Sequence, residues 1–221
     1  MLKLENYSSK ILSNISLNID NKNLIILGSN GAGKTTLAKV LSGVIASENI
    51  EFESPKTKFI NYIPSYLEIF DDFLSVSEFL QLSHLHGVKT IDEVLHLLQI
   101  EHLKDKSCKN LSSGESQLLL IASSILHGAK YTILDEPTSN LDPKKVKMVY
   151  KVLKDEKSLQ NRIIITHNLH LAYKLGFDVV YVEDGKINFL GTNEQFFSSE
   201  NLQKVFDGSV KKIDENIVTA L

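Results

Sequence analysis

The glycine-rich stretch at 28–35 places the strongest constraint on this chain. It fits the pattern of a glycine, four further residues and then Gly-Lys-Thr, and it follows an apolar run at 24–27 that suits a buried strand. A glycine-rich turn at the start of a helix presents backbone N–H groups and the positive end of the helix dipole to phosphate oxygens. The sequence therefore predicts a nucleotide-binding loop, in which Lys34 contacts the β- and γ-phosphates and Thr35 ligates Mg²⁺.

The composition is that of an ordinary globular protein. The 221 residues are 43% hydrophobic and 23% charged, which suffices for a sizeable core in one large or two modest domains. The net charge of −3 gives no general electrostatic case for a nucleic-acid partner. Cys108 is the single cysteine, which excludes an internal disulfide and a cysteine metal cluster. No apolar run approaches ~20 residues, so we expect any role at a membrane to depend on a partner protein.

The spacing of apolar residues predicts an α/β fold. Between residues 65 and 107 it is helical, which indicates a small helical insert, and from Leu111 onward strands and helices alternate. Such alternation is typical of a parallel sheet with crossover helices. We expect two antiparallel strands at the start, with a turn near Ser8, and further strands at 49–53, 58–63, 131–134 and 162–166. Helices are expected at 115–127 and at 143–154, the second with Asp142 as its N-cap. A hairpin across Asp184 and Gly185 and a tail of short helices with a final strand would complete the chain.

Titratable residues stand at the ends of two of these strands. Asp135 and Glu136 follow the strand at 131–134, and His167 follows the strand at 162–166. Taken singly, an Asp-Glu pair can cap a strand end and a histidine can be structural. Because the carboxyl ends of parallel strands meet at one edge of a sheet, we expect these residues to share a site with the phosphate loop. Asp135 would then hold Mg²⁺ directly or through water, Glu136 would polarise the attacking water, and His167 would sense or stabilise the γ-phosphate.

Taken together, the motifs resemble those of the ATP-binding cassette (ABC) transporter ATPases over essentially the whole chain. They occur in the order and at the spacings of that family. The matching segments are the Walker A motif (28–35), the signature motif (111–115), the Walker B motif (133–136), the D-loop (139–142), the switch histidine (His167) and the aromatic residue that stacks on adenine (Tyr7).

The resemblance implies a fold and a domain organisation. We expect a P-loop NTPase core with a largely parallel sheet, an N-terminal antiparallel β subdomain and a helical subdomain insert. One ABC ATPase domain would span residues 1–221. The helical subdomain would occupy 65–107 within the RecA-like core, and a short C-terminal extension would occupy 192–221.

The resemblance also implies Mg²⁺-dependent ATP hydrolysis coupled to transport. Two copies of the chain would pair head-to-tail around two ATP–Mg²⁺, with each signature segment capping the ATP on the partner's phosphate loop. This homodimer would drive a separate integral membrane permease from the cytoplasmic side of the cell (inner) membrane. A substrate-binding protein would be a further partner of an importer, and no nucleic acid would take part.

Residue roles follow from the same resemblance. Glu136 and His167 would be catalytic, and Thr35 and Asp135 would coordinate Mg²⁺. The nucleotide would contact Tyr7, Gly28, Ser29, Asn30, Gly31, Ala32, Gly33, Lys34, Thr35 and Thr36; the signature residues acting on the partner's site would be Ser112, Ser113, Gly114 and Glu115; and the D-loop would act through Ser139 and Asp142.

Three positions depart from the pattern of the family. Ser65 stands where the family usually has glutamine, and its shorter side chain leaves its part in metal coordination open. Ser113 replaces a glycine of the signature motif, and Glu115 stands where glutamine is commoner. A nucleotide-gated switch, or a soluble non-transport cassette protein with little sustained hydrolysis, is therefore the alternative to a working transport ATPase.

The tail and the helical insert bear on the transported solute and the permease. The segment at 191–206 resembles the corresponding segment of ATPases that drive uptake of iron-siderophores, haem and vitamin B12. That similarity predicts import of a metal chelate, haem or cobalamin. Phe70, Phe73 and Leu74 are candidates for contact with the permease, unless they complete the core of the insert.

Overall fold

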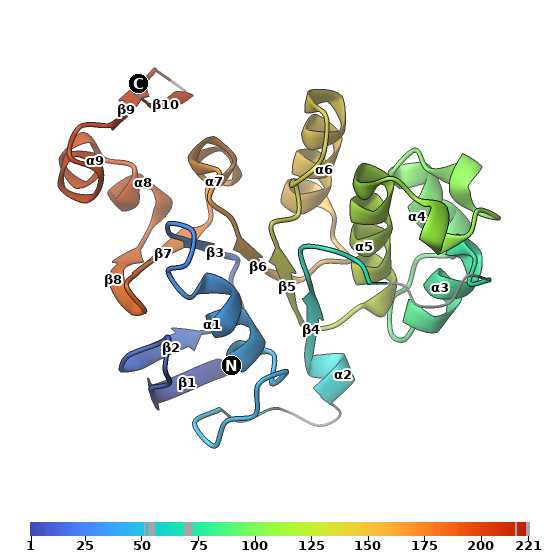
Figure 1. Cartoon of the computed structure of the whole chain (residues 1–221), viewed down its shortest axis with the longest axis horizontal. Coiled ribbons are helices and arrows are strands. Elements are labelled where there is room, and N and C mark those ends of the chain that lie inside the picture. The colour runs from blue at the N-terminus through green and yellow to red at the C-terminus, as the bar shows by residue number, and fades with distance from the viewer. Residues whose placement is uncertain (51, 53–55, 69–72, 215, 220–221) are drawn as a thin grey trace. The chain divides into compact units, whose positions relative to one another are not determined.

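The structure is a computed structural model that describes the whole chain except residues 51, 53–55, 69–72, 215 and 220–221 (Figure 1). It divides into two compact units. The terminal unit comprises residues 1–51 and 163–221, and the central unit comprises residues 52–162.

Parallel strands form the middle of the terminal unit. Strand β3 (Leu24–Leu27) pairs in parallel with both β6 (Asn161–Ile165) and β7 (Asp178–Glu183), and β8 (Lys186–Gly191) pairs antiparallel with β7. All four residues of β3 are buried, as expected for a parallel strand covered on both faces. Helix α1 (Lys34–Leu41) follows β3, and α7 (Leu169–Leu175) follows β6.

The N-terminal strands form a separate antiparallel pair in this unit. In β1 (Leu2–Tyr7) and β2 (Ile15–Ile19), buried and exposed residues alternate, and Leu2 lies opposite Ile19. This confirms the predicted pair. The strand predicted at 49–53 is represented by an isolated bridge from Ile50 to Leu4, and residues 51 and 53 lie outside the described part of the chain.

The tail adds short elements to the terminal unit. Helix α8 (Asn193–Phe196) carries the fully buried Phe196, whose ring packs against those of Tyr181, Phe189, Phe197 and Phe206. Helix α9 (Ser199–Phe206) is followed by the antiparallel strands β9 (Val210–Ile213) and β10 (Asn216–Thr219). The sequence predicts short helices and one final strand; the structure has a hairpin instead of that strand.

Two parallel strands and a set of helices form the central unit. Strand β4 (Ile60–Ile63) pairs in parallel with β5 (Tyr131–Asp135). The predicted strand at 58–63 is wrong for its first two residues, because Lys58 and Phe59 belong to helix α2 (Lys56–Phe59). Phe59 is buried there, with its ring 5.3 Å from that of Tyr131, so packing on β5 rather than strand pairing fixes its position.

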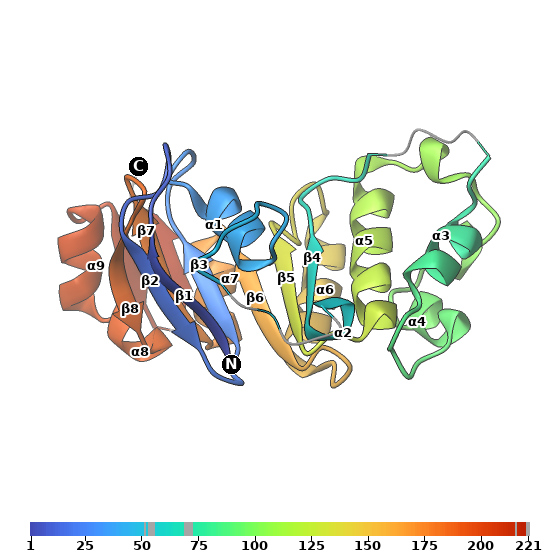
Figure 2. The ribbon, with the colours of Figure 1, turned by 90° about the horizontal axis from the view of Figure 1, so that it is seen from below.

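The long helix of the central unit is α5 (Ser113–His127), against which α3 (Val76–Ser83) and α4 (Ile91–Leu97) pack (Figure 2). Two 3₁₀ turns, η1 (Glu101–Leu103) and η2 (Cys108–Asn110), lead from α4 to α5. Helices α3 and α4 and the turn η1 fall within the predicted helical insert, whereas η2 and α5 follow it in the chain. The division of the chain into subdomains at 65–107 and 192–221 stays a prediction.

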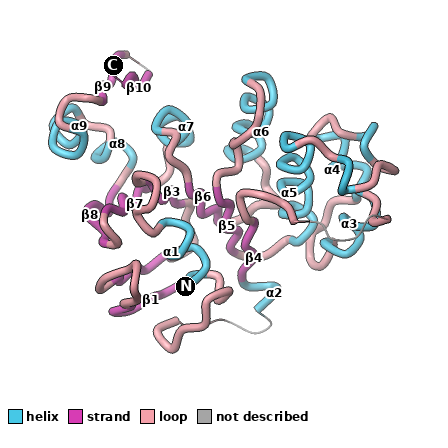
Figure 3. The backbone as a smooth tube through the Cα atoms, viewed as in Figure 1, coloured by secondary structure: helices cyan, strands magenta, loops and turns pink. Residues whose placement is uncertain are grey.

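Helix α6 (Pro143–Asp155) completes the central unit. Its N-cap is Asp142, whose carboxylate accepts a hydrogen bond from the Lys145 N–H at 3.0 Å, and Pro143 is its first residue, as predicted. Figure 3 shows the strands of each unit with helices around them, and the predicted α/β class with a largely parallel sheet is confirmed. None of the helices formed by the described residues has the length and apolar character that a membrane span needs.

Candidate functional site

The phosphate loop connects β3 to α1 in the terminal unit. Gly28 has φ of +156°, and a Cβ there would lie 2.2 Å from the carbonyl oxygen of Val182. Gly33 has φ of +100°, and a Cβ there would lie 2.7 Å from Leu12 Cδ2. Side chains at these two positions would collide with the neighbouring strand and turn, so the path of the loop requires glycine.

Lys34 is the first residue of α1, and its side chain is buried, with 7% of the residue exposed. Its ammonium donates hydrogen bonds to the carbonyl oxygens of Gly28, at 2.9 Å, and Ser29, at 2.8 Å. The cation is thereby fixed at the mouth of the loop and at the N-terminus of a helix. A desolvated cation in this position favours an anionic ligand.

The other loop residues divide into supporting and accessible ones. Ala32 is buried and Gly33 half-buried, whereas Ser29, Asn30 and Gly31 are exposed. On the following helix Thr35 is exposed and Thr36 half-buried. The exposed side of the loop thus carries polar groups and a glycine, as a phosphate ligand would need.

The turn between β1 and β2 supports this loop. Leu12 is almost fully buried beside Gly33, and the Ser9 N–H donates to the carbonyl oxygen of Leu12 at 2.7 Å. The Ser13 N–H donates to the carbonyl oxygen of Gly185 at 2.8 Å, and the Gly185 N–H donates to that of Ala32 at 3.2 Å. Sequence reasoning placed Gly185 only in a hairpin turn and missed that it holds the phosphate loop.

Replacing Gly185 by alanine is expected to lower the free energy of unfolding by roughly 2–4 kcal/mol, because a backbone clash adds to the cost of a positive φ. Its φ is +71°, and a Cβ would lie 1.9 Å from the carbonyl oxygen of Ile11. The matched control is Gly176→Ala, where φ is +73° and a Cβ meets nothing within 4 Å. Urea unfolding measures both losses; equal losses would contradict a role for the Ile11 contact.

His167 lies at the same end of the parallel strands as the phosphate loop. Ile26 on β3 is in register with Ile165 on β6, so Gly28 and His167 each stand two residues beyond a paired position. The Thr166 N–H donates to the carbonyl oxygen of Ile26 at 3.2 Å. His167 itself is exposed. The structure therefore brings the predicted histidine and the phosphate loop to one edge of the sheet.

Tyr7 ends β1, where its backbone pairs with that of Ile15 after an irregularity in the register. The tyrosine is half-buried. Its role in stacking on adenine stays a prediction.

The acidic pair lies in the central unit. Asp135 ends β5 and is 2% exposed, and its Oδ2 accepts a hydrogen bond from the Tyr62 hydroxyl on β4 at 3.2 Å. Burial, together with the charge of Asp135, raises the pKa of Tyr62 well above its usual range, so the phenol stays protonated and donates. Sequence reasoning missed Tyr62. The signal was its place in a strand next to β5, where a long phenol can reach the strand end.

Glu136 follows Asp135 with φ of +49°, in the left-handed region. Its carbonyl oxygen accepts hydrogen bonds from Ser139 Oγ at 2.9 Å and from Gln117 Nε2 at 3.5 Å, which hold this backbone conformation. Ser65 lies at the same end of the β4–β5 pair as Glu136. Ile63 is in register with Leu134, and Ser65 and Glu136 each lie two positions beyond these paired residues. Ser65 and Glu136 are half-buried.

The predicted signature segment begins α5. Ser112 is the N-cap: its Oγ accepts from the Glu115 N–H at 3.3 Å, and the Glu115 carboxylate accepts from the Ser112 N–H at 2.7 Å. Ser112 and Ser113 are exposed, whereas Gly114 is buried. A Cβ on Gly114 would lie 3.0 Å from the carbonyl oxygen of Asn140, so the segment at 139–142 packs directly against the signature segment.

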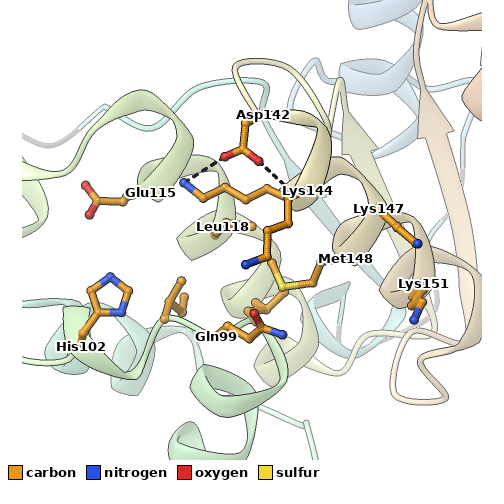
Figure 4. Close-up of a pocket in the computed structure, with 12 residues that line it drawn as sticks. Gln99, His102, Glu115, Leu118, Asp142, Lys144, Lys147, Met148 and Lys151 are labelled. Atoms are coloured by element: carbon orange, nitrogen blue, oxygen red, sulfur yellow. Dashed lines mark hydrogen bonds and ion pairs between the residues drawn. The ribbon is translucent and has the colours of Figure 1, made fainter.

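A cavity of about 490 Å³ opens in the central unit beside these residues (Figure 4). Glu115 and Asp142 lie at its edge, and Asp142 bonds to Lys145. Its remaining lining residues come from the segment at 98–102 and from α5 and α6: Leu98, Gln99, Ile100, His102, Leu118, Lys144, Lys147, Met148 and Lys151.

Comparison with known families decides the identity of the chain. The model of the ABC transporter family matches residues 12–139, more than half of the chain and including the phosphate loop, the signature segment and the acidic pair. The chain belongs to the ABC transporter family. It is an ATP-binding subunit, and its family members are ATPases.

Relatives and solved structures agree with this. A probable iron chelatin transport ATP-binding protein of Helicobacter pylori (strain J99) is 31% identical, with 97% of this chain and 96% of the relative covered. The zinc import ATP-binding protein ZnuC of Wigglesworthia glossinidia brevipalpis is 36% identical, with 74% and 72% covered. A dimeric bacterial ABC transporter cassette has the same fold, with a TM-score of 0.73 at 20% identity and 87% and 99% covered.

The ABC motifs thus form two groups in the structure. The terminal unit holds the Walker A loop and His167. The central unit holds Ser65, the signature segment, Asp135 with Glu136, and the D-loop. That the two groups make one shared site stays a prediction.

Replacing Tyr62 by phenylalanine is expected to remove the hydrogen bond that orients the carboxylate of Asp135, the aspartate of the Walker B motif. Loss of a hydrogen bond to a carboxylate costs about 1.5–3 kcal/mol of unfolding free energy. We also expect the Mg²⁺ concentration for half-maximal hydrolysis to rise several-fold. The control is Tyr66→Phe, which removes an exposed hydroxyl whose hydrogen bond to Glu68 raises the pKa of Tyr66. Equal behaviour of the two variants would contradict the role of Tyr62.

Proposed function

We propose that this ABC ATPase hydrolyses ATP at two composite sites in a head-to-tail homodimer and thereby drives import of a metal ion or metal chelate through a separate permease. The observation that carries the dimer is the exposed start of α5. Ser112 and Ser113 present hydroxyl groups at a helix N-terminus, where phosphate oxygens bind well. The Walker A loop of a second copy would supply the phosphates.

The roles of the residues follow from their chemistry. Backbone N–H groups of the loop and the Lys34 ammonium bind the phosphates, and Tyr7 stacks on the adenine. The Thr35 hydroxyl and the Asp135 carboxylate are hard oxygen donors, which suit Mg²⁺. When bound, Mg²⁺ neutralises charge on the β- and γ-phosphates.

Hydrolysis depends on the two predicted catalytic residues. Glu136 accepts a proton from the attacking water, and His167 donates a hydrogen bond to the γ-phosphate. Ser139 and Asp142 place the D-loop, the latter as cap of α6. Loss of the γ-phosphate removes the contacts that join the two copies, and the dimer opens.

The proposed solute and membrane partner are inferred from the names of the relatives. Zinc and iron chelatin in their names favour a metal or metal-chelate cargo, and an importer would also use a substrate-binding protein. The cassette would lie on the cytoplasmic side of the cell (inner) membrane. Phe73, which is 91% exposed, and the half-buried Leu74 remain candidates for the permease contact; Phe70 lies outside the described residues.

A nucleotide-gated switch with little sustained hydrolysis is the second candidate. The observation that favours it is Ser65, which lies two residues beyond β4, at the same end of the strands as Glu136, and whose side chain is shorter than that of glutamine. A serine there reaches less far toward a metal or water, so positioning of the attacking water would be weaker.

Sedimentation and turnover measurements on the purified chain test the proposal. We expect a dimer with Mg²⁺-ATP and a monomer with Mg²⁺-ADP. We also expect many turnovers per chain when the permease, isolated as the membrane protein that co-purifies with this chain, is present. A dimer that completes one turnover and stops, even with that protein, would support the switch. Absence of an ATP-dependent dimer would contradict both candidates.

A further inference from the structure

We propose that Lys106 is a positioning residue for the ATP held by the partner copy. It neutralises the carboxylate of Glu115 and keeps it turned into the cap of α5, so that the signature segment presents donors rather than a negative charge to the partner's γ-phosphate. This inference rests on the proposed head-to-tail dimer.

A glutamate in the signature segment poses an electrostatic difficulty. Glu115 lies in the first turn of α5, within three residues of the exposed Ser112. The pKa of Glu115 is lowered to about 2, chiefly by the backbone hydrogen bond from Ser112 and also by Lys106, so the residue is charged at neutral pH. A carboxylate so near a triphosphate repels it, which the glutamine common in the family would not do.

Lys106 lies where it can cancel that charge. Its Nζ is 3.0 Å from Oε2 and 3.2 Å from Oε1 of Glu115, so both carboxylate oxygens are contacted. The two side chains are 36% and 20% exposed, so solvent screens this pair less than a pair on the open surface. The carboxylate thus accepts hydrogen bonds from Lys106 and from the Ser112 N–H, which fix its direction.

The two other capping boxes among the described residues that contain a glutamate, at α3 and α4, show what Lys106 adds. At α3, the Ser75 hydroxyl itself donates to the Glu78 carboxylate at 2.6 Å, and at α4 the Thr90 hydroxyl donates to Glu93 at 2.9 Å. At α5, the Lys106 ammonium contacts the glutamate as well. Glu115 therefore keeps a charge-assisted partner when the Ser112 hydroxyl turns toward a phosphate oxygen.

The backbone holds Lys106 in place. Its N–H donates to the carbonyl oxygen of Leu103 at 2.9 Å, and its own carbonyl accepts from the Val76 N–H at 3.0 Å. The residue is thus tied to η1 on one side and to the start of α3 on the other. With the backbone already fixed, only the torsions of the lysine side chain have to be ordered against Glu115.

The test is Lys106→Met, with Lys104→Met as matched control. Lys104 lies two residues away in the same segment but pairs with the exposed Asp92 at 2.6 Å. We expect Lys106→Met to weaken the Mg²⁺-ATP-dependent dimer on the order of tenfold, since an unpaired carboxylate then faces the partner's phosphates. Binding of a fluorescent ATP analogue to the monomer should stay unchanged in both variants, because neither lysine lies in the Walker A loop.

Rescue by a second substitution separates this role from a structural one. Lys106→Met combined with Glu115→Gln should recover the dimerisation constant of the unsubstituted chain, and Lys106→Arg should retain it. Dimerisation of Lys106→Met at the level of Lys104→Met, or a double variant as weak as Lys106→Met alone, overturns the inference while leaving the proposed function intact. Failure of the unsubstituted chain to dimerise with ATP overturns the proposed function and this inference with it.

Discussion

Replacing Glu136 by glutamine is expected to slow ATP hydrolysis by about 10²–10⁴-fold, the usual contribution of a general base. Glutamine has the same shape but cannot accept a proton from water. The backbone at this position is held by Ser139 and Gln117 through the carbonyl oxygen of Glu136, independently of its side chain. The substituted side chain should therefore occupy the same place, and the fold should remain intact.

The same variant should also trap the ATP-bound dimer, because the γ-phosphate contacts that join the two copies persist. Steady-state phosphate release measures the first effect and sedimentation with Mg²⁺-ATP the second. Glu200→Gln, at an exposed site in the first turn of α9, is the control and should behave like the unsubstituted chain. A Glu136→Gln variant that hydrolyses ATP at the original rate would show that another group activates the water.

Replacing Lys34 by methionine is expected to weaken ATP binding by about 10²-fold. A hydrogen bond to a charged phosphate contributes about 1.5–3 kcal/mol to binding. We expect a value near the upper end of this range, because the Lys34 ammonium is buried and solvent screens its charge little. Methionine keeps most of the length of the side chain, so the packing around this buried residue should survive. We therefore expect the free energy of unfolding to change by only ~1 kcal/mol, since removal of a buried charge offsets the lost hydrogen bonds.

Calorimetric titration with Mg²⁺-ATP measures the affinity. Lys39→Met is the matched control, because Lys39 lies in the last turn of the same helix and outside the loop. If Lys34→Met and Lys39→Met both bind ATP as tightly as the unsubstituted chain, backbone N–H groups alone bind the phosphates.

Much of the fold follows from local patterns in the sequence. Alternating apolar residues predict β1 and β2, the apolar runs predict β3, β5 and β6, and Asp142 with Pro143 marks the start of α6. The error at Lys58 and Phe59 arose because Phe59 fits a strand as well as a buried helical turn. Its contact with Tyr131, far away in the sequence, decides between them.

The site follows from the sequence only in part. Motif spacing predicts the Walker A loop, Asp135, Glu136 and His167, because each lies at or just beyond the carboxyl end of a strand. The contacts that hold these residues join segments far apart in the sequence: Tyr62 to Asp135 and Gly185 to Ala32. No local pattern specifies them, since the partner in each pair is chosen by how strands and helices pack.

The turn between β1 and β2 has a practical consequence for protein engineering. Surface loops usually tolerate inserted tags and fluorophores, and Ile11 in this turn is 53% exposed. Yet Leu12 beside it packs on Gly33, and Ser13 bonds to Gly185. A label attached at Ile11 would therefore report directly on the Walker A loop, whereas a longer insertion there would disturb nucleotide binding from a position that looks harmless.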